Sequence, residues 1–222
     1  DFLAYRAMDT AWLQREVAIA QPALLDALRA SGGLVLTYHT HHQNTLSSAL
    51  GLAGITISPL ASAPEDSPLF PLIGRWAQRV NADSAIHFNG GAYVFTDNLR
   101  VLVKAVRKLL NNRDVVLSLC DFHQPRPEAN AKGRLFDRSI TPPTGAIDIA
   151  LRHGAPIYAA ICAPQGGVLS LQLTRLDDAG GAAAVVAGYF SFLEQSIRAN
   201  PACWQGWEWF EDLPTLMSTQ TP

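Results

Sequence analysis

The sequence predicts an α/β fold in which a largely parallel central sheet is flanked by helices. Short apolar runs, typical of buried strands, alternate along the chain with segments of helical periodicity. The 222 residues, 48% of them hydrophobic, supply ample material for a core. We therefore expect one domain over residues 1–222, with an N-terminal helical segment at 1–32 and an α/β core at 33–212.

The first half of the chain is expected to contain three strands and several helices. Residues 1–30 are predicted to be helical, with a break at Pro22. The expected strands are 34–38, 55–58 and 84–88, and the expected later helices are about 43–53, 72–80 and 99–110. The proline-rich residues 59–71 are predicted to form a loop, and Thr96 or Asp97 is the predicted cap of the helix that follows.

In the second half a buried strand is predicted at 115–119, followed by a long polar segment at 120–144. Loops of this length inside compact domains are usually functional or disordered. A helix is expected at 145–152 and another at 182–198, with strands at 156–163 and 168–173 between them that favour an antiparallel pair. Aromatic residues crowd the end of the chain: Trp204, Trp207, Trp209 and Phe210. We expect them to pack on the core or cap the sheet, with an interfacial membrane contact as the functional alternative.

Composition excludes several classes of protein. A formal net charge of −2 gives no footprint for nucleic-acid binding. The three cysteines, Cys120, Cys162 and Cys203, have no CxxC spacing, which favours a reducing compartment over a disulfide framework or a thiolate zinc site. No apolar run approaches the roughly 20 residues that cross a bilayer. Residues 1–7 lack the basic flank and long apolar centre of a signal peptide.

The strand at 34–38 leads directly into three histidines, His39, His41 and His42. A parallel strand that ends before a helix places the next side chains at the carboxyl edge of the sheet. Histidine is the side chain best suited to move a proton near neutral pH. We predict that His39 acts as a general base.

Asn44, five positions after His39, is the first predicted partner of the imidazole. It could accept a hydrogen bond from one ring N–H and leave the other nitrogen free as the base. The alternative is that these polar residues only cap the following helix. The HxH pair of His39 and His41 also fits a metal-dependent hydrolase if Asp121, His123 or His87 completes the set. We predict no metal, because no acid lies between Tyr38 and Glu65.

A second polar group, Cys120 to His123, follows the strand at 115–119. In a parallel sheet it lies at the same edge as His39, so Asp121 could orient an imidazole. Cys120 could be a nucleophile if a base lowers its pKa, but we interpret it as a small buried side chain. A basic stripe at helical spacing precedes this strand, formed by Arg100, Lys104, Arg107, Lys108 and Arg113. It is either a solvated surface or a dock for an acidic carrier protein or anionic headgroups.

Several motifs in order resemble the late lipid A acyltransferases, the bacterial family with an HxxxxD/E motif. The apolar strand ends in His39, position 44 follows, and a helix reaches Gly51. A helix rich in basic residues, the strand DVVLSLCDFH and the segment GRLFDRSITPPTGAIDIALRHGAPIYAAI come next. The tail LEQSIRANPACWQGWEW is similar to the family's closing pattern. The resemblance covers about residues 34–209.

The resemblance implies a sandwich-like acyltransferase fold and transfer of a fatty acyl chain from an acyl-carrier-protein or coenzyme A thioester to a hydroxyl or amine. His39 would deprotonate the acceptor, and the family's second aspartate falls on Asp121. Backbone N–H groups near Thr144 and Gly145 would bind the oxyanion. His42, His123, Arg100 and Lys104 would contact substrate. No cofactor is implied, and the expected location is cytoplasmic, with possible peripheral contact at the inner face of the cytoplasmic membrane.

The chain departs from the family pattern at three points. Asn44 replaces the acid, Thr96 stands where the family has an arginine, and the residues given contain no N-terminal membrane helix. These departures favour a lipid or secondary-metabolite acceptor other than lipid A. The alternatives are a thioesterase on the same scaffold, with water as the acceptor, or a non-catalytic module that binds acyl carriers.

Overall fold

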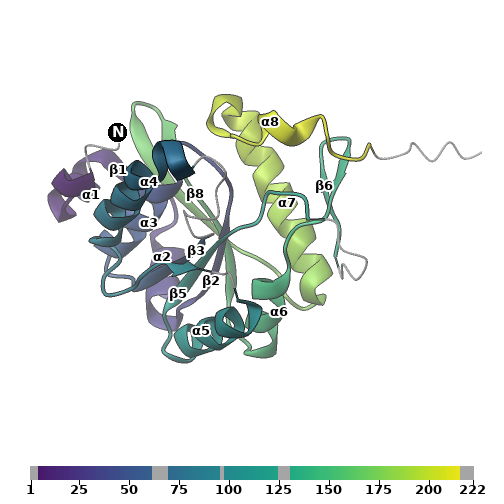
Figure 1. Ribbon diagram of the computed structural model, residues 1–222, viewed down its shortest axis with the longest axis horizontal. Helices are drawn as coiled ribbons and strands as arrows, with labels where there is room; N and C mark the ends of the chain where they lie inside the picture. The colour runs from purple at the N-terminus through teal and green to yellow at the C-terminus, as the bar shows by residue number, and fades with distance from the viewer. Residues whose placement is uncertain (1–4, 62–69, 96–97, 125–130, 216–222) are drawn as a thin grey trace, which may run out of the picture.

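The computed structural model describes residues 5–61, 70–95, 98–124 and 131–215, and it has the predicted α/β fold (Figure 1). Its described residues form a seven-stranded sheet in the order β1-β9-β8-β2-β5-β3-β4. β8 and β9 are antiparallel, and the other neighbouring strands of this sheet are parallel. A separate antiparallel pair, β6 and β7, lies beside α7. The structure therefore confirms the predicted largely parallel sheet flanked by helices.

The strands and helices have the following bounds. The strands are β1 Val17–Ile19, β2 Gly33–Thr37, β3 Ile57–Ala61, β4 Val94–Phe95, β5 Val115–Leu119, β6 Gly133–Leu135, β7 Arg138–Ile140, β8 Ile157–Gln165 and β9 Val168–Arg175. The α-helices are α1 Thr10–Glu16, α2 Pro22–Ser31, α3 Gln43–Leu52, α4 Phe70–Ala85, α5 Leu99–Asn111, α6 Gly145–Arg152, α7 Gly181–Ala199 and α8 Trp207–Phe210. Short 3₁₀ turns lie at η1 Tyr5–Ala7 and η3 Pro201–Cys203. Within the described ranges, none of the helices is both long and apolar enough to cross a membrane.

All five residues of the central strand β2 are buried, which shows that both faces of the sheet are covered at its centre. Leu34 and Leu36 pack into the core cluster that contains residues of α6 and α7. Val35 faces the opposite cluster, with residues of α2 and α3. Figure 1 shows α2 and α3 on one side of the sheet and α6 and α7 on the other. Two-sided burial explains why β2 is apolar throughout instead of alternating.

Two predicted segments of the first half differ from the structure. Two helices, α1 and α2, cover much of the predicted helical range 1–30, of which residues 1–4 are outside the described residues. The prediction was wrong at residues 17–19, which form β1 and pair with β9. The strand predicted at 84–88 was also wrong, because α4 continues to Ala85 and the chain then turns at Asn89 and Gly90, both with positive φ. Ile86, part of that apolar run, is 60% exposed, so the run lacks a second buried face.

The predicted loops are also more structured than expected. β3 extends into the proline-rich stretch as far as Ala61, and residues 62–69 lie outside the described residues. The segment 120–144 contains the β6–β7 hairpin. The N-cap of α5 is Asn98, whose Oδ1 accepts from the backbone N–H groups of Arg100 and Val101. The structure thus assigns this role to a different residue from the predicted Thr96 or Asp97, which lie outside the described residues. Asparagine at this position satisfies two N–H groups that the helix leaves free.

Candidate active site

The strand register brings His39 and Asp121 together. β2 and β5 are parallel neighbours, and their last paired residues are Thr37 and Leu119. Cys120 N donates to Thr37 O at 2.9 Å, which continues the ladder past the strand end. Two residues beyond that last pair, the segments that follow β2 and β5 place His39 and Asp121 at the same carboxyl edge of the sheet. The two polar groups that the sequence placed after separate strands therefore form one site.

Asp121 and His39 form a hydrogen-bonded pair with a fully buried carboxylate. Asp121 Oδ1 lies 2.7 Å from His39 Nδ1, and Oδ2 accepts from His39 N at 3.0 Å. The Asp121 side chain is 0% exposed, whereas the His39 side chain is 27% exposed. Because a carboxylate can only accept, the neutral form of this imidazole carries its proton on Nδ1 and has its lone pair on Nε2. Among the described residues no hydrogen bond engages Nε2, so this nitrogen is available as a base.

The carboxyl-terminal segment closes this pair. We refer to residues 200–215, which include η3 and α8, as the C-terminal strap. Trp204 Nε1 donates to Asp121 Oδ2 at 2.9 Å. The backbone of Trp204 also forms an isolated antiparallel β-bridge with Thr40. Gln205 N donates to His39 O at 3.0 Å. The strap therefore supplies a third N–H donor to the carboxylate and fixes the backbone on both sides of the imidazole.

Aromatic rings surround the imidazole. The ring centroid of Trp209 lies 5.7 Å from that of His39, and the ring centroid of Phe122 lies 6.1 Å from it, both in edge-to-face orientation. On the β2 side, the buried Tyr189 hydroxyl of α7 donates to Thr37 O at 2.7 Å. The imidazole of His39 is therefore partly exposed and is flanked by the aromatic rings of Phe122 and Trp209.

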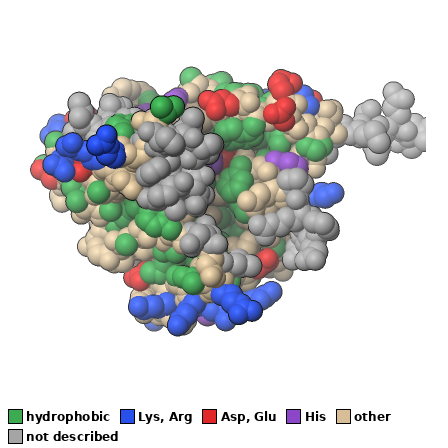
Figure 2. Space-filling view, viewed as in Figure 1, with side chains coloured by type: hydrophobic (Ala, Val, Ile, Leu, Met, Phe, Trp, Pro, Cys, Tyr) green, Lys and Arg blue, Asp and Glu red, His purple; other side chains and the backbone are tan. Residues whose placement is uncertain are grey.

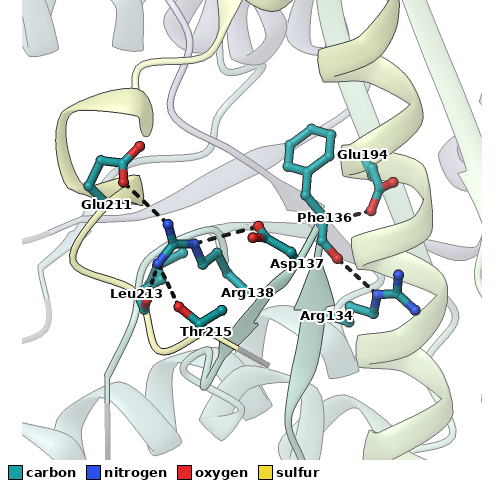
Figure 3. A network of polar contacts seen from close by, with 8 residues as sticks. All are labelled: Arg134, Phe136, Asp137, Arg138, Glu194, Glu211, Leu213 and Thr215. Carbon is teal, nitrogen blue, oxygen red and sulfur yellow. Dashed lines mark hydrogen bonds and ion pairs between the residues drawn. The ribbon is translucent and has the colours of Figure 1, made fainter. Parts of the chain in front are cut away.

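The far end of the C-terminal strap is held by the β6–β7 hairpin, as Figure 3 shows. Arg138 donates to Leu213 O at 3.1 Å and to Thr215 Oγ1 at 3.0 Å, and it pairs with Glu211 at 3.2 Å. The hairpin is itself bound to α7, because Glu194 accepts from Phe136 N at 2.9 Å. The strap is therefore anchored at Asp121 and at Arg138, with α8 between the two anchors.

Asn44 is not the partner of His39. It is the second residue of α3 and is half-buried, and within the described residues no hydrogen bond joins it to the imidazole. The register of β2 and β5 instead places Asp121 against Nδ1. The carboxylate that the HxxxxN sequence lacks at position 44 is thus supplied by a neighbouring strand.

The other predicted histidines have different surroundings. His42 is the N-cap residue of α3 without a side-chain cap bond; burial, followed by the neighbouring His41, lowers its pKa. His123 Nδ1 accepts from Thr141 N at 3.0 Å, which ties the strand end to the segment before α6. His87 binds the carbonyl of Tyr5. In the described part of the chain, no group of three or more His, Cys, Asp or Glu residues is arranged to hold a metal ion.

Thr144 and Gly145 begin α6 close to the strand end that carries Asp121. Thr144 Oγ1 donates to Asp148 Oδ2 at 3.4 Å, and Gly145 is the first helical residue. The preceding Pro143 accepts a hydrogen bond from Cys120 Sγ at 3.8 Å. The amino end of α6 therefore lies by the residue next to Asp121, while neither Thr144 nor Gly145 bonds to His39.

Cys120 is buried, and its thiol is expected to be unreactive. Burial raises the pKa of its thiol far above the ordinary value, with the Asp121 charge adding to this, and burial raises the pKa of Cys162 to about 12. A protonated, enclosed thiol is a poor nucleophile. We expect Cys120 of the native protein to resist labelling by N-ethylmaleimide, and Cys120→Ala to leave any catalytic turnover unchanged. An acyl adduct on Cys120 in intact-mass spectra would contradict this.

Arg100 and Lys104 lie away from the imidazole. They are on α5, at the lower end of the molecule in Figure 1, whereas α8 and its Trp209 are at the upper end. All five cations of the basic stripe are exposed, and none forms an ion pair within the described residues. Figure 2 shows Lys and Arg side chains gathered at this lower end. The structure therefore separates the basic stripe from the His39 site.

The residues that sequence reasoning missed are Trp204 as a donor to Asp121 and Tyr189 as a donor to the end of β2. The closing tryptophan pattern was a signal for Trp204, although it did not reveal the bond to a carboxylate 83 residues away. No protein-family model and no curated protein matches the chain. The site that the structure describes is a carboxylate-bound imidazole beside aromatic rings, and within the described ranges no serine, threonine or cysteine side chain is hydrogen-bonded to that imidazole.

Proposed function

We propose that the protein is an acyltransferase that moves a fatty acyl chain from a thioester to a hydroxyl or amine acceptor, with His39 as general base. The observation that carries the proposal is the hydrogen bond between His39 Nδ1 and the buried Asp121 carboxylate, together with an Nε2 that none of the described residues engages. Such a pair can take a proton from an incoming nucleophile and then return it to a leaving thiolate.

The surroundings of His39 favour direct transfer over a covalent enzyme intermediate. In the described residues, no serine, threonine or cysteine side chain is hydrogen-bonded to the imidazole, and Cys120 is enclosed. This favours a nucleophile that comes from outside the protein. Phe122 and Trp209 offer an apolar surface that suits an alkyl chain. The motif order that resembles the late lipid A acyltransferases supports the same chemistry.

Asp121 explains how such a reaction could proceed without an acid at position 44. In the resembling family the acid follows the histidine by five residues, whereas here a carboxylate from the neighbouring strand bonds Nδ1. Its negative charge can stabilise the imidazolium that forms when the acceptor loses its proton. The departure at Asn44 is therefore compatible with catalysis.

The test is a product analysis of the wild-type protein. Acyl-carrier-protein and coenzyme A thioesters of several chain lengths are incubated with hydroxyl and amine acceptors, and thiol release, acylated acceptor and free fatty acid are measured by mass spectrometry. The proposal predicts thiol release matched by acylated acceptor. Thiol release matched only by free fatty acid would identify a thioesterase. Binding of the donors without thiol release would overturn the enzymatic proposal.

The exposed cations of the basic stripe suit an acidic carrier protein as the donor, which would then dock at a distance from His39. Reversing charge with Arg100→Glu and Lys104→Glu should raise the KM for the acyl-carrier-protein donor by about 10-fold, because rim charges govern the encounter of charged partners. The kcat should be unchanged, since α5 lies away from His39. The control variant reverses two charges elsewhere, with Arg6→Glu and Arg15→Glu. Both arginines are exposed, and each is paired with an acid. Equal KM values for all three proteins would remove α5 from donor binding.

A further inference from the structure

Trp209 carries a polar atom that the surrounding residues do not satisfy. Its indole Nε1 is buried and has no hydrogen-bond partner among the described residues. The other two indoles of the C-terminal strap are satisfied: Trp204 Nε1 donates to Asp121, and Trp207 Nε1 donates to Pro201 O at 2.8 Å. Buried N–H groups in folded proteins are almost always paired, so an unpaired one beside a candidate active site calls for an explanation.

The indole of Trp209 lies beside the other rings of the site. The Trp209 ring meets the His39 ring edge-to-face at 5.7 Å and the Trp204 ring at 6.4 Å. Trp204 is held by the same Asp121 carboxylate that orients His39. The base, its carboxylate and the unsatisfied N–H therefore belong to one connected set of contacts.

We propose that the Trp209 indole N–H binds the carbonyl oxygen of the acyl thioester and stabilises the oxyanion during transfer, a role that rests on the proposed function. The acceptor oxygen or nitrogen bonds to the thioester carbon while Nε2 of His39 takes its proton. The carbonyl π electrons move onto the oxygen, which then accepts a hydrogen bond from Trp209. Collapse of the intermediate breaks the carbon–sulfur bond, and the leaving thiolate takes the proton from the imidazolium.

α8 is suited to admit a substrate at this position. It is four residues long, and none of its residues is buried. It lies between the two anchors of the C-terminal strap, at Trp204 and at Arg138. In this proposal a bound substrate displaces α8 between the two anchors and so reaches Nε1. An N–H donor beside the general base suits charge that develops only in the transition state.

The kinetic test removes the N–H and keeps an aromatic ring. Trp209→Phe should lower kcat by about 10²-fold, the effect of losing one oxyanion donor, with a smaller change in KM. The matched control is Trp207→Phe on the same helix, which should keep the wild-type kcat because Trp207 Nε1 already bonds to Pro201 O. β-(3-Benzothienyl)alanine at position 209, which replaces N–H by sulfur at nearly constant shape, should reproduce the loss even if the phenylalanine variant folds poorly.

A spectroscopic test observes the N–H directly in the wild-type protein. The chain has five tryptophans, so the ¹H–¹⁵N spectrum has five indole signals, and the one missing in Trp209→Phe or in the benzothienyl protein is assigned to Trp209. An acyl coenzyme A analogue with a methylene in place of the thioester sulfur should shift that signal downfield. An unmoved signal at saturation, or wild-type kcat in the benzothienyl protein, would overturn the role of Trp209 while leaving the acyltransferase proposal intact. Absence of acyl transfer by the wild-type protein would refute the proposed function itself.

Discussion

His39→Ala should abolish acyl transfer, and Asp121→Asn should lower kcat by about 10⁴-fold, as the equivalent carboxylate-to-amide change does in a Ser-His-Asp triad. The first change removes the only group that we assign to proton transfer. The second keeps the shape of the side chain and removes its negative charge. Steady-state kinetics with a thioester donor, followed by thiol release, measure both effects.

The hydrogen bonds of Asp121 explain why an amide should be so harmful. Oδ2 accepts from two N–H groups, those of His39 N and Trp204 Nε1. An amide must keep its oxygen at that position, because its NH₂ group would otherwise face both donors. The NH₂ group then faces His39 Nδ1 and can only donate. Nδ1 becomes the acceptor, the ring proton moves to Nε2, and the nitrogen that faces the substrate is no longer a base.

The two substitutions should not be additive, because the residues act as one unit. The double variant should be no slower than His39→Ala alone. His41→Ala is the matched control, since it removes an exposed imidazole two residues from the site and should leave kcat unchanged. Thermal unfolding of each variant separates loss of catalysis from loss of structure. An Asp121→Asn protein with near wild-type kcat would show that the carboxylate does not control the base.

The meeting of His39 and Asp121 could be predicted from the sequence because it follows from a general rule. Both residues come directly after apolar strands, and parallel strands end at one edge of a sheet. The sequence could not identify which of Asn44 and Asp121 bonds the imidazole. That choice depends on the pairing of β2 with β5 and on its register. Each strand has one hydroxyl side chain, Thr37 or Ser118, and these two residues are not paired with each other, so they do not reveal the register.

The contributions of Trp204 and of the hairpin lie beyond the reach of local patterns. Trp204 reaches Asp121 across 83 residues, and a tryptophan in an aromatic tail is equally suited to plain core packing. β6 and β7 are three residues each, too short for alternation to emerge from a polar segment. The same shortness hides β1, which follows α1 without an intervening turn. Tertiary contacts, more than local propensity, determine these elements.

Gly51→Ala should lower the free energy of unfolding by about 3 kcal/mol through overpacking against backbone. Gly51 lies in α3, the helix that follows His39, and a Cβ at this position would lie 1.6 Å from the carbonyl oxygen of His87. The neighbouring backbone is not free to move, because Phe88 is fully buried and its carbonyl accepts from Ile57 N and Gly91 N. Urea unfolding followed by circular dichroism measures the loss.

The control for Gly51 is Gly145→Ala, because a Cβ at the first residue of α6 meets no atom within 4 Å. Its unfolding free energy should change by less than about 1 kcal/mol, the ordinary difference between the two residues in a helix. The sequence could predict the helix that contains Gly51, but it could not explain why glycine occupies that position. The reason is the carbonyl of His87, 36 residues further along the chain. Equal stability of the two variants would mean that α3 does not pack as closely as described, and the surroundings of His39 at its amino end would need revision.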